Sequence, residues 1–251
     1  MPELRVWPDA AALYRAAAEE FARQAADAVA ARGRFAVALA GGSTPRGMYG
    51  LLASDLGLRD SVPWETTHVF WGDERPVGPD HPDSNYRMAA AARLSKVPIA
   101  PANVHRIQGE AVDPGTAAAD YEAVLRSSFA LGADELPTFD LILLGLGTDA
   151  HTASLFPGTA ALNEQHRLVV ANRVDRLGAT RITFTLPVIN RARCVMFLVS
   201  GADKADAVWV TLHGPREPRR WPAQSIEPSP GRCLWMLDAP AASMLGGEVL
   251  P

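Results

Sequence analysis

The stretch Phe139-Asp140-Leu141-Ile142-Leu143-Leu144-Gly145-Leu146-Gly147-Thr148-Asp149-Ala150-His151 decides the fold of this chain. Its apolar half is typical of a strand buried in a parallel sheet, and the glycines predict a tight turn where that strand ends. In open α/β sheets the carboxyl ends of the strands are where ligands bind. The stretch therefore places His151 at a binding edge, with Asp149 two residues before it.

An imidazole at such an edge can take up and return a proton near neutral pH. This makes His151, with Asp149 beside it, the candidate catalytic pair. The alternative is a histidine that only caps a turn or fills the core. The strand followed by a glycine turn favours the catalytic interpretation.

Strands and helices alternate along the chain without a break in composition, a repeat or a linker. Strands are expected at 35–40, 67–71, 104–107, 139–144, 167–174, 181–186, 194–199 and 232–237. Helices are expected at 9–32, from 43 through 52, at 84–94, 115–131 and 203–212, in a turn at 187–191, and after Ala239. The pattern predicts one domain over residues 1–251, with a single doubly wound, mostly parallel sheet flanked by helices.

A second glycine-rich turn, Gly41-Gly42-Ser43-Thr44-Pro45, follows the strand at 35–40. Ser43 or Thr44 can cap the next helix, and Pro45 suits its first turn. Free backbone N–H groups at such a helix start form an anion site. The turn lacks the spaced glycines of a dinucleotide site and the Lys-Ser/Thr of a P-loop. The alternative is an ordinary tight turn.

Three cations lie near expected strand ends. Lys204 falls in the first turn of the helix after strand 194–199, where the helix dipole disfavours a positive charge unless it faces an anion. Arg75 follows one strand and Arg181 begins another, and each offers a planar fork suited to phosphate oxygens. Each of the three could instead be solvated or paired with a surface acid.

Other chemistries find less support. Asp73 and Glu74 are adjacent, so in extended backbone only one of them faces a pocket and a paired-carboxylate mechanism is disfavoured. The six histidines show neither HExxH nor Cys/His ligand spacing, so no metal site is predicted. No Gly-x-Ser-x-Gly motif is present, which argues against a serine esterase.

The composition is that of a globular protein, with 48% hydrophobic and 21% charged residues. A net charge of −4 argues against nucleic acid as a partner. Cys194 and Cys233 lie in apolar runs and are expected to be buried free thiols, as in a reducing cytoplasm. The chain shows no signal peptide at its start and no apolar run of membrane-spanning length. We expect a soluble cytoplasmic protein, monomeric or weakly dimeric, with no membrane association.

Six motifs, in order, give the chain a resemblance to the 6-phosphogluconolactonases of the pentose phosphate pathway. They cover about residues 10–240 and lie at 39–45, 70–75 (Phe-Trp-Gly-Asp-Glu-Arg), 80–86 (Asp-His-Pro-Asp-Ser-Asn-Tyr), 145–158, 181–183 and 200–204. Each motif alone is weak, whereas together they are highly specific.

The resemblance implies a Rossmann-like fold shared with glucosamine-6-phosphate deaminases, and hydrolysis of 6-phosphogluconolactone to 6-phosphogluconate. It implies that His151 is the general base. A δ-lactone is already an electrophilic ester, so an activated water and oxyanion donors can suffice, and no metal or organic cofactor is expected. The residues that the resemblance assigns to the phosphate are Gly42, Ser43, Thr44, Arg181 and Lys204, with Arg75 also lining the site.

One position departs from the family pattern. The family usually has glycine immediately before the histidine, where this chain has Ala150. If that position needs a positive φ, alanine is strained there. The donors for a lactone oxyanion are not identified by a motif, and backbone N–H groups of 145–147 are the candidates.

Two other functions fit the sequence less well. An amino-sugar-phosphate deaminase/isomerase would have tyrosine where Arg75 stands and glutamate after the histidine motif, where this chain has residues 155–158, Leu-Phe-Pro-Gly. Both differences favour the lactonase. A sugar-phosphate-sensing domain of a transcription regulator would carry a helix-turn-helix segment, but here the first helix leads directly into the first core strand.

Overall fold

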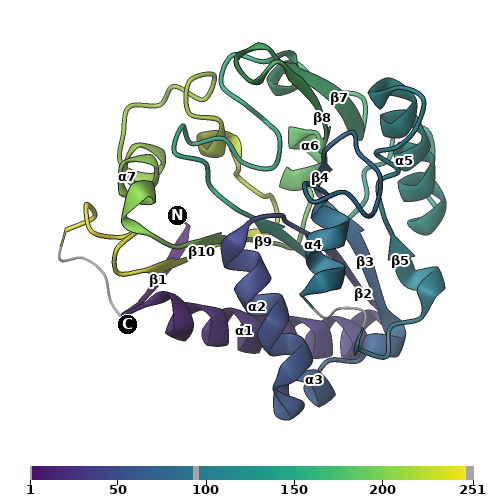
Figure 1. The fold of residues 1–251 in the computed structure, drawn as a ribbon, viewed down its shortest axis with the longest axis horizontal. Helices are drawn as coiled ribbons and strands as arrows, with labels where there is room; N and C mark the ends of the chain where they lie inside the picture. The colour runs from purple at the N-terminus through teal and green to yellow at the C-terminus, as the bar shows by residue number, and fades with distance from the viewer. Residues whose placement is uncertain (1, 93–95, 247–251) are drawn as a thin grey trace.

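A seven-stranded parallel sheet forms the centre of the computed structural model, which describes residues 2–92 and 96–246 (Figure 1). Its strand order is β1-β10-β9-β6-β2-β3-β5, and every neighbouring pair runs parallel. The strands are β1 (Glu3–Trp7), β2 (Phe35–Leu39), β3 (Thr67–Trp71), β5 (Val104–His105), β6 (Leu141–Leu144), β9 (Cys194–Val199) and β10 (Arg232–Asp238). The expected doubly wound parallel sheet is confirmed.

A second, three-stranded sheet was not expected. It has the order β4-β8-β7, is antiparallel, and comprises β4 (Asp73–Glu74), β7 (Val169–Val174) and β8 (Ala179–Phe184). Assigning these two later strands to the main sheet was wrong. The tight connection at η5 (Asp175–Leu177), which ends at Gly178 with φ +59°, is too short for a crossover, so the strands it joins can only pair antiparallel.

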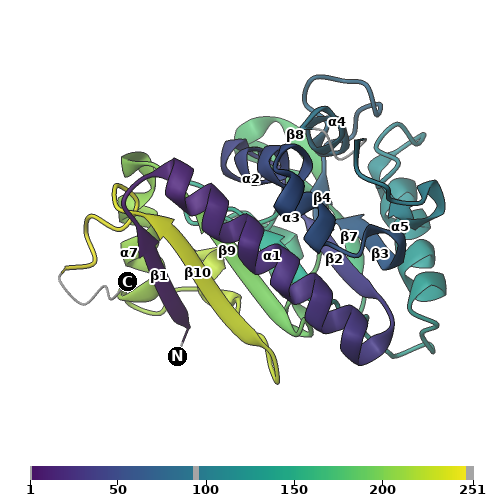
Figure 2. The ribbon, with the colours of Figure 1, turned by 90° about the horizontal axis from the view of Figure 1, so that it is seen from below.

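Helices lie on both sides of the parallel sheet. In Figure 2, α1 (Ala10–Arg32) crosses one face, and it packs against α2 (Ser43–Ser54) and α3 (Leu56–Ser61). On the other side in Figure 1 lie α6 (Leu186–Asn190), α7 (Ala205–Leu212) and the three-stranded sheet, which is backed by α5 (Pro114–Ser128). The short helix α4 (Asn85–Ala91) stands beside β4.

The limits of α1 follow the predicted capping. Asp9 accepts a hydrogen bond from the N–H of Ala12 at 2.8 Å, and Gly33, at φ +75°, donates its N–H to the carbonyl of Val29. The many alanines are a packing device as well as helix formers, because Ala18 and Ala25 are fully buried. Small side chains allow the helix to approach the sheet closely.

The central strands are buried along their whole length. Every residue of β2, β6 and β9 is buried, as expected for parallel strands covered on both faces. Asp140, 7% exposed, precedes β6, and its carboxylate accepts the N–H of Ala36 at 2.9 Å and pairs with Arg32 at 2.8 Å. This carboxylate ties the start of β6 to β2.

Several element limits differ from expectation. The edge strand β1 was missed, because a five-residue strand with two charges and one neighbour leaves little hydrophobic signal. The helix expected after Ala239 is wrong: residues 239–246 form turns, since Asp238 accepts the N–H of Ala241 and bends the chain. The helix expected at 84–94 is α4, which ends at Ala91, and positions 93 and 94 fall outside the described residues. Both cysteines are free, with Cys194 buried and Cys233 partly exposed.

No helix within residues 2–92 and 96–246 is long and apolar enough to cross a membrane.

At the sheet edge, His68 of β3 and His105 of β5 form a close pair. Their Nδ1 and Nε2 atoms are 3.3 Å apart, and the ring of His105 also stacks on Phe70 at 4.4 Å. Burial, followed by the charges of His68 and Arg34, lowers the pKa of His105 to about 4, and burial lowers the pKa of His68 as well. The folded protein therefore holds these rings neutral at a pH where the unfolded chain protonates them.

This pair predicts a loss of stability on mild acidification. Between about pH 6.5 and pH 4 the unfolded state binds more protons, so the free energy of unfolding falls as the pH falls through that window. Between pH 7.5 and 5.0, the free energy of unfolding should fall by about 1 kcal/mol less in His105→Gln than in the wild type, after allowance for solvent screening of a half-buried ring. Urea unfolding of both proteins at the two pH values measures this difference. The exposed His166→Gln variant is the control, and equal losses in both variants would contradict the prediction.

Candidate active site

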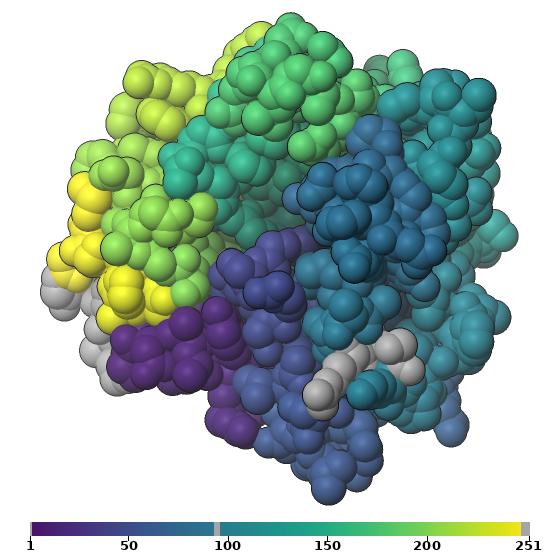
Figure 3. Space-filling view, viewed as in Figure 1, coloured from purple at the N-terminus to yellow at the C-terminus, as the bar shows by residue number. Residues whose placement is uncertain are grey.

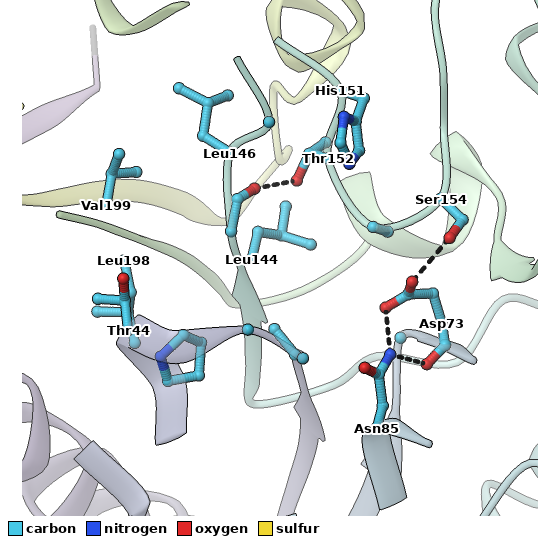
Figure 4. Close-up of a pocket in the computed structure, with 18 of the residues that line it drawn as sticks. Thr44, Asp73, Asn85, Leu144, Leu146, His151, Thr152, Ser154, Leu198 and Val199 are labelled. Carbon is cyan, nitrogen blue, oxygen red and sulfur yellow. Dashed lines mark hydrogen bonds between the residues drawn. The ribbon is translucent and has the colours of Figure 1, made fainter. Parts of the chain in front are cut away.

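A cavity of about 620 Å³ opens at the carboxyl ends of β2, β3, β6 and β9. The hollow in the middle of Figure 3 lies over these strand ends, and Figure 4 shows the side chains around the cavity. Its lining includes all eight residues that the sequence singled out, namely Gly42, Ser43, Thr44, Arg75, Asp149, His151, Arg181 and Lys204. The fold therefore brings the expected set together in one place.

One wall of the cavity is the start of α2. Gly42, at φ +102°, is the N-cap residue and has no side chain to cap the helix, so the expectation that Ser43 or Thr44 caps it is wrong. The reason is that the left-handed glycine begins the turn one residue earlier, which leaves both hydroxyls within the first helical turn. Gly41 must also be glycine, since a Cβ there would lie 2.0 Å from Oδ1 of Asn85.

Three cations line the same cavity, namely Arg75, Arg181 and Lys204. Arg75 donates to Oδ1 of Asn85 at 2.7 Å. Burial, and then the positive charge of Arg75, lowers the pKa of Arg181. Lys204 is the N-cap residue of α7, one position before the helix rather than within its first turn, and Nζ lies 3.1 Å from Oδ2 of Asp203. Because Arg75 and Arg181 repel each other, an anion bound between them would relieve the repulsion.

The turn after β6 carries a histidine–carboxylate pair. Nδ1 of His151 lies 2.5 Å from Oδ1 of Asp149. Burial acts to raise the pKa of Asp149, but its hydrogen bond to His151 and the charges of His151 and Arg176 outweigh burial and hold that pKa below its usual value. An ionised Asp149 assigns the ring proton to Nδ1, which leaves Nε2 as the acceptor.

The same turn depends on small residues. A Cβ on Gly147 would lie 2.0 Å from Nδ1 of His151 and 2.6 Å from Oδ1 of Asp149, so any larger residue would displace the pair. Ala150, which is fully buried, has φ +56°. The turn does need a positive φ at this position, and an L-residue there costs about 1–2 kcal/mol.

The candidate oxyanion donors need correction. The N–H of Gly147 already donates to the carbonyl of His151 at 2.9 Å, within the turn itself. It is therefore not free to bind a developing oxyanion, and including it among the candidates was wrong.

A further carboxylate, that of Asp73, lines the same cavity, and its negative charge acts on Arg181. Asp73 accepts from Oγ of Ser154 at 2.7 Å and from Nδ2 of Asn85 at 3.2 Å, as Figure 4 shows. Glu74 points away, is 1% exposed, and accepts three backbone N–H groups, including that of Tyr86. The expectation that only one of these two acids faces the pocket is confirmed.

The candidate set drawn from the sequence omitted several side chains that line the cavity, among them Asn85, Ser154, Phe156 and Arg176. Asn85 and Ser154 stand inside recognised motifs, so their place in the motifs was an available signal. Arg176 lies in the β7–β8 hairpin of the second sheet, and no local pattern in the sequence indicates its position.

Across residues 2–92 and 96–246, no group of three or more His, Cys, Asp and Glu side chains is placed to hold a metal ion.

These features define a class of protein: an α/β protein with a histidine–carboxylate pair and three cations in one cavity at the sheet's carboxyl edge. A family model described as glucosamine-6-phosphate isomerases/6-phosphogluconolactonase matches residues 8–235. The chain belongs to this family.

Known relatives agree with that assignment. The chain is 48% identical over 218 residues to a 6-phosphogluconolactonase of Synechocystis sp., covering 87% of this chain and 88% of the relative. It is 42% identical to a 6-phosphogluconolactonase of Nostoc sp., covering 96% and 98% of the two chains. Among solved structures, 6-phosphogluconolactonase from Trypanosoma cruzi superposes with a TM-score of 0.85 at 27% identity, covering 98% of each chain.

Gly147 and Gly145 form a matched test of the histidine–carboxylate pair. Gly147→Ala should break the contact between His151 and Asp149, because its Cβ occupies their place, while Gly145→Ala meets no atom within 4 Å. Proton NMR at low temperature should show a downfield imidazole N–H resonance in the wild type and Gly145→Ala, and its loss in Gly147→Ala. Circular dichroism checks that both variants fold. A resonance that persists in Gly147→Ala would contradict the geometry.

Proposed function

We propose that this chain is a 6-phosphogluconolactonase, which hydrolyses 6-phospho-D-glucono-1,5-lactone to 6-phosphogluconate. The observation that carries the proposal is that one cavity joins the His151–Asp149 pair to Arg75, Arg181 and Lys204. A substrate that carries both a phosphate and an electrophilic carbonyl matches a cavity that holds both these cations and the histidine–carboxylate pair. The names of the relatives at 42–48% identity support the same activity.

In this proposal the phosphate sits at the start of α2. The backbone N–H groups of Ser43 and Thr44, close to Gly42, face an anion with the helix dipole behind them. Arg181 and Lys204 supply positive charge, and Arg75 lines the same cavity. Arg75 is already held by Asn85, so it contributes charge from a fixed position.

The chemistry needs one base and one water. Nε2 of His151 takes a proton from water while the water oxygen bonds to the lactone carbonyl carbon. That carbon becomes tetrahedral, and the former carbonyl oxygen becomes the oxyanion. When the carbonyl re-forms, the bond from that carbon to the ring oxygen breaks, and the imidazolium returns its proton to that oxygen. Asp149 stays ionised throughout and stabilises the imidazolium. No metal or organic cofactor is needed for these steps.

The main rival is an amino-sugar-phosphate deaminase/isomerase, because the matched family includes both activities. Two features favour the lactonase. Where a deaminase would have a glutamate after the histidine motif, Phe156 stacks on His151 at 4.1 Å, and no carboxylate other than Asp149 bonds to this histidine in the described part of the chain. Where a deaminase would have tyrosine after Asp-Glu, this chain has Arg75. Release of ammonia from glucosamine 6-phosphate would overturn the assignment.

The proposal extends to the protein as a whole. We propose that residues 1–251 form one lactonase domain, since a continuous buried core runs from Leu13 to Ala242. We further propose a cytoplasmic monomer or weak dimer that binds neither nucleic acid nor membranes. The free thiols, the net charge of −4 and the scattering of exposed large apolar side chains over different elements support this.

The direct test is hydrolysis of freshly generated 6-phosphogluconolactone, corrected for spontaneous opening. Turnover well above the uncatalysed rate is expected, and its absence would overturn the proposal.

The proposed phosphate contacts of Arg181 and Lys204 predict a specific kinetic pattern. Arg181→Ala or Lys204→Ala should lower kcat/KM by about 10–150-fold, mainly through KM, because each removes a charge-assisted contact of about 1.5–3 kcal/mol. Steady-state kinetics measure it, with the exposed Arg167→Ala variant as the control. An unchanged kcat/KM for Lys204→Ala would mean that Lys204 only pairs with Asp203.

The proposed role of His151 as general base predicts an effect on kcat rather than on KM. His151→Asn should lower kcat by about 10²–10⁴-fold with little change in KM, because imidazole contributes to proton transfer and not to phosphate binding. The wild-type rate should also fall toward acidic pH, a limb absent from the variant. If the variant keeps the wild-type rate and the acid limb, the base lies elsewhere, and Asp73 is the next candidate.

A further inference from the structure

Arg176 reaches the active-site cavity from the second sheet. It lies in η5 (Asp175–Leu177), at the tip of the hairpin that joins β7 to β8, and its side chain is 52% exposed. Arg176 nevertheless lines the cavity, together with Asp149 and His151. None of the steps described above uses it.

Arg176, Asp149, His151 and Phe156 form a closed ring of contacts that includes the catalytic pair. Its Nη2 donates to Oδ2 of Asp149, while the other oxygen of that carboxylate contacts His151. The imidazole of His151 stacks on Phe156 with centroids 4.1 Å apart, and the guanidinium carbon of Arg176 lies 5.1 Å from the centre of that same ring. Each of the four groups thus contacts two others.

We propose that Arg176 is a positioning residue for the His151–Asp149 pair. It holds one carboxylate oxygen of Asp149, so that the other oxygen is presented to Nδ1 of His151, and it closes over Phe156 so that the imidazole ring keeps its orientation. The role of Arg176 in lactone hydrolysis rests on the proposed function. Its role in positioning the imidazole ring of His151 does not depend on that function.

The proposal has an electrostatic consequence. Asp149, on the same turn, favours a protonated imidazole, and Arg176 offsets part of that attraction by sharing the carboxylate. The other charges that line the cavity are Arg181 from β8, Asp73 and Arg75 after β3, and Asp203 and Lys204 after β9, and they are the same with or without Arg176. Removing Arg176 should therefore let the imidazole keep its proton to a higher pH.

Arg176 could instead bind the phosphate, since a guanidinium on a cavity wall suits that anion. The two roles separate kinetically. A phosphate ligand lost by substitution raises KM, whereas a positioning residue lost by substitution lowers kcat and moves the acid limb of the rate profile. If the residue only stabilises the hairpin, its substitution lowers the melting temperature and changes neither KM nor the acid limb.

The test compares Arg176→Gln, which removes the charge, Arg176→Lys, which keeps it, and Arg173→Gln as the matched control. Arg173 lies on the same hairpin and pairs with Asp175, but it does not line the cavity. For Arg176→Gln we expect kcat about tenfold lower, KM within about twofold, and an acid limb of kcat about half a pH unit higher, as befits a half-exposed charge. Arg176→Lys should restore the acid limb but only part of kcat, and Arg173→Gln should resemble the wild type.

Histidine NMR makes the test independent of the substrate. With the His151 signal assigned from its absence in His151→Asn, the titration midpoint of that signal should be higher in Arg176→Gln than in the wild type or Arg173→Gln. An unchanged midpoint and acid limb, or a rise in KM alone, would overturn the positioning role. If the wild type shows no lactonase activity, the proposed function fails, and the NMR shift still decides the role of Arg176.

Discussion

The parallel pairing of β6 with β2 on one side and β9 on the other is the constraint on which the site depends. Parallel neighbours end at the same edge, so three turns from distant parts of the sequence, after β2, β6 and β9, open into one cavity. The buried carboxylate of Asp140 ties the start of β6 to Ala36 and Arg32. A shift of β6 by one residue would break these bonds and move the histidine turn relative to α2.

The cavity holds two groups of charges. Arg75 and Arg181 lie close enough to disfavour each other, which favours an anion between them. Asp149 is kept ionised by His151 and Arg176 despite partial burial. The first group therefore carries positive charge suited to an anion, while the second holds a carboxylate in contact with a histidine. Asp73, fixed by Ser154 and Asn85, adds acceptor oxygens to the same cavity.

Small residues make these close approaches possible. Gly41 leaves room for Asn85, and Gly147 leaves room for the histidine–carboxylate pair, since a Cβ at either position would lie 2.0 Å from a side-chain atom. Ala150 takes a positive φ in the same turn without the freedom of glycine. The strain at Ala150 is tolerated because its methyl group is fully buried.

The sequence by itself determined the parallel sheet, the capped α1, and the residues gathered at its edge, because continuous apolar runs, capping residues and glycine turns are local signals. Only the tertiary structure decided the second sheet, the edge strand β1 and the glycine cap of α2. These depend on which strand finds which partner and on one backbone angle at Gly42. Arg176 shows the limit most clearly. It follows Asp149 by 27 residues, and only the antiparallel closure of β7 on β8 brings its charge to that carboxylate.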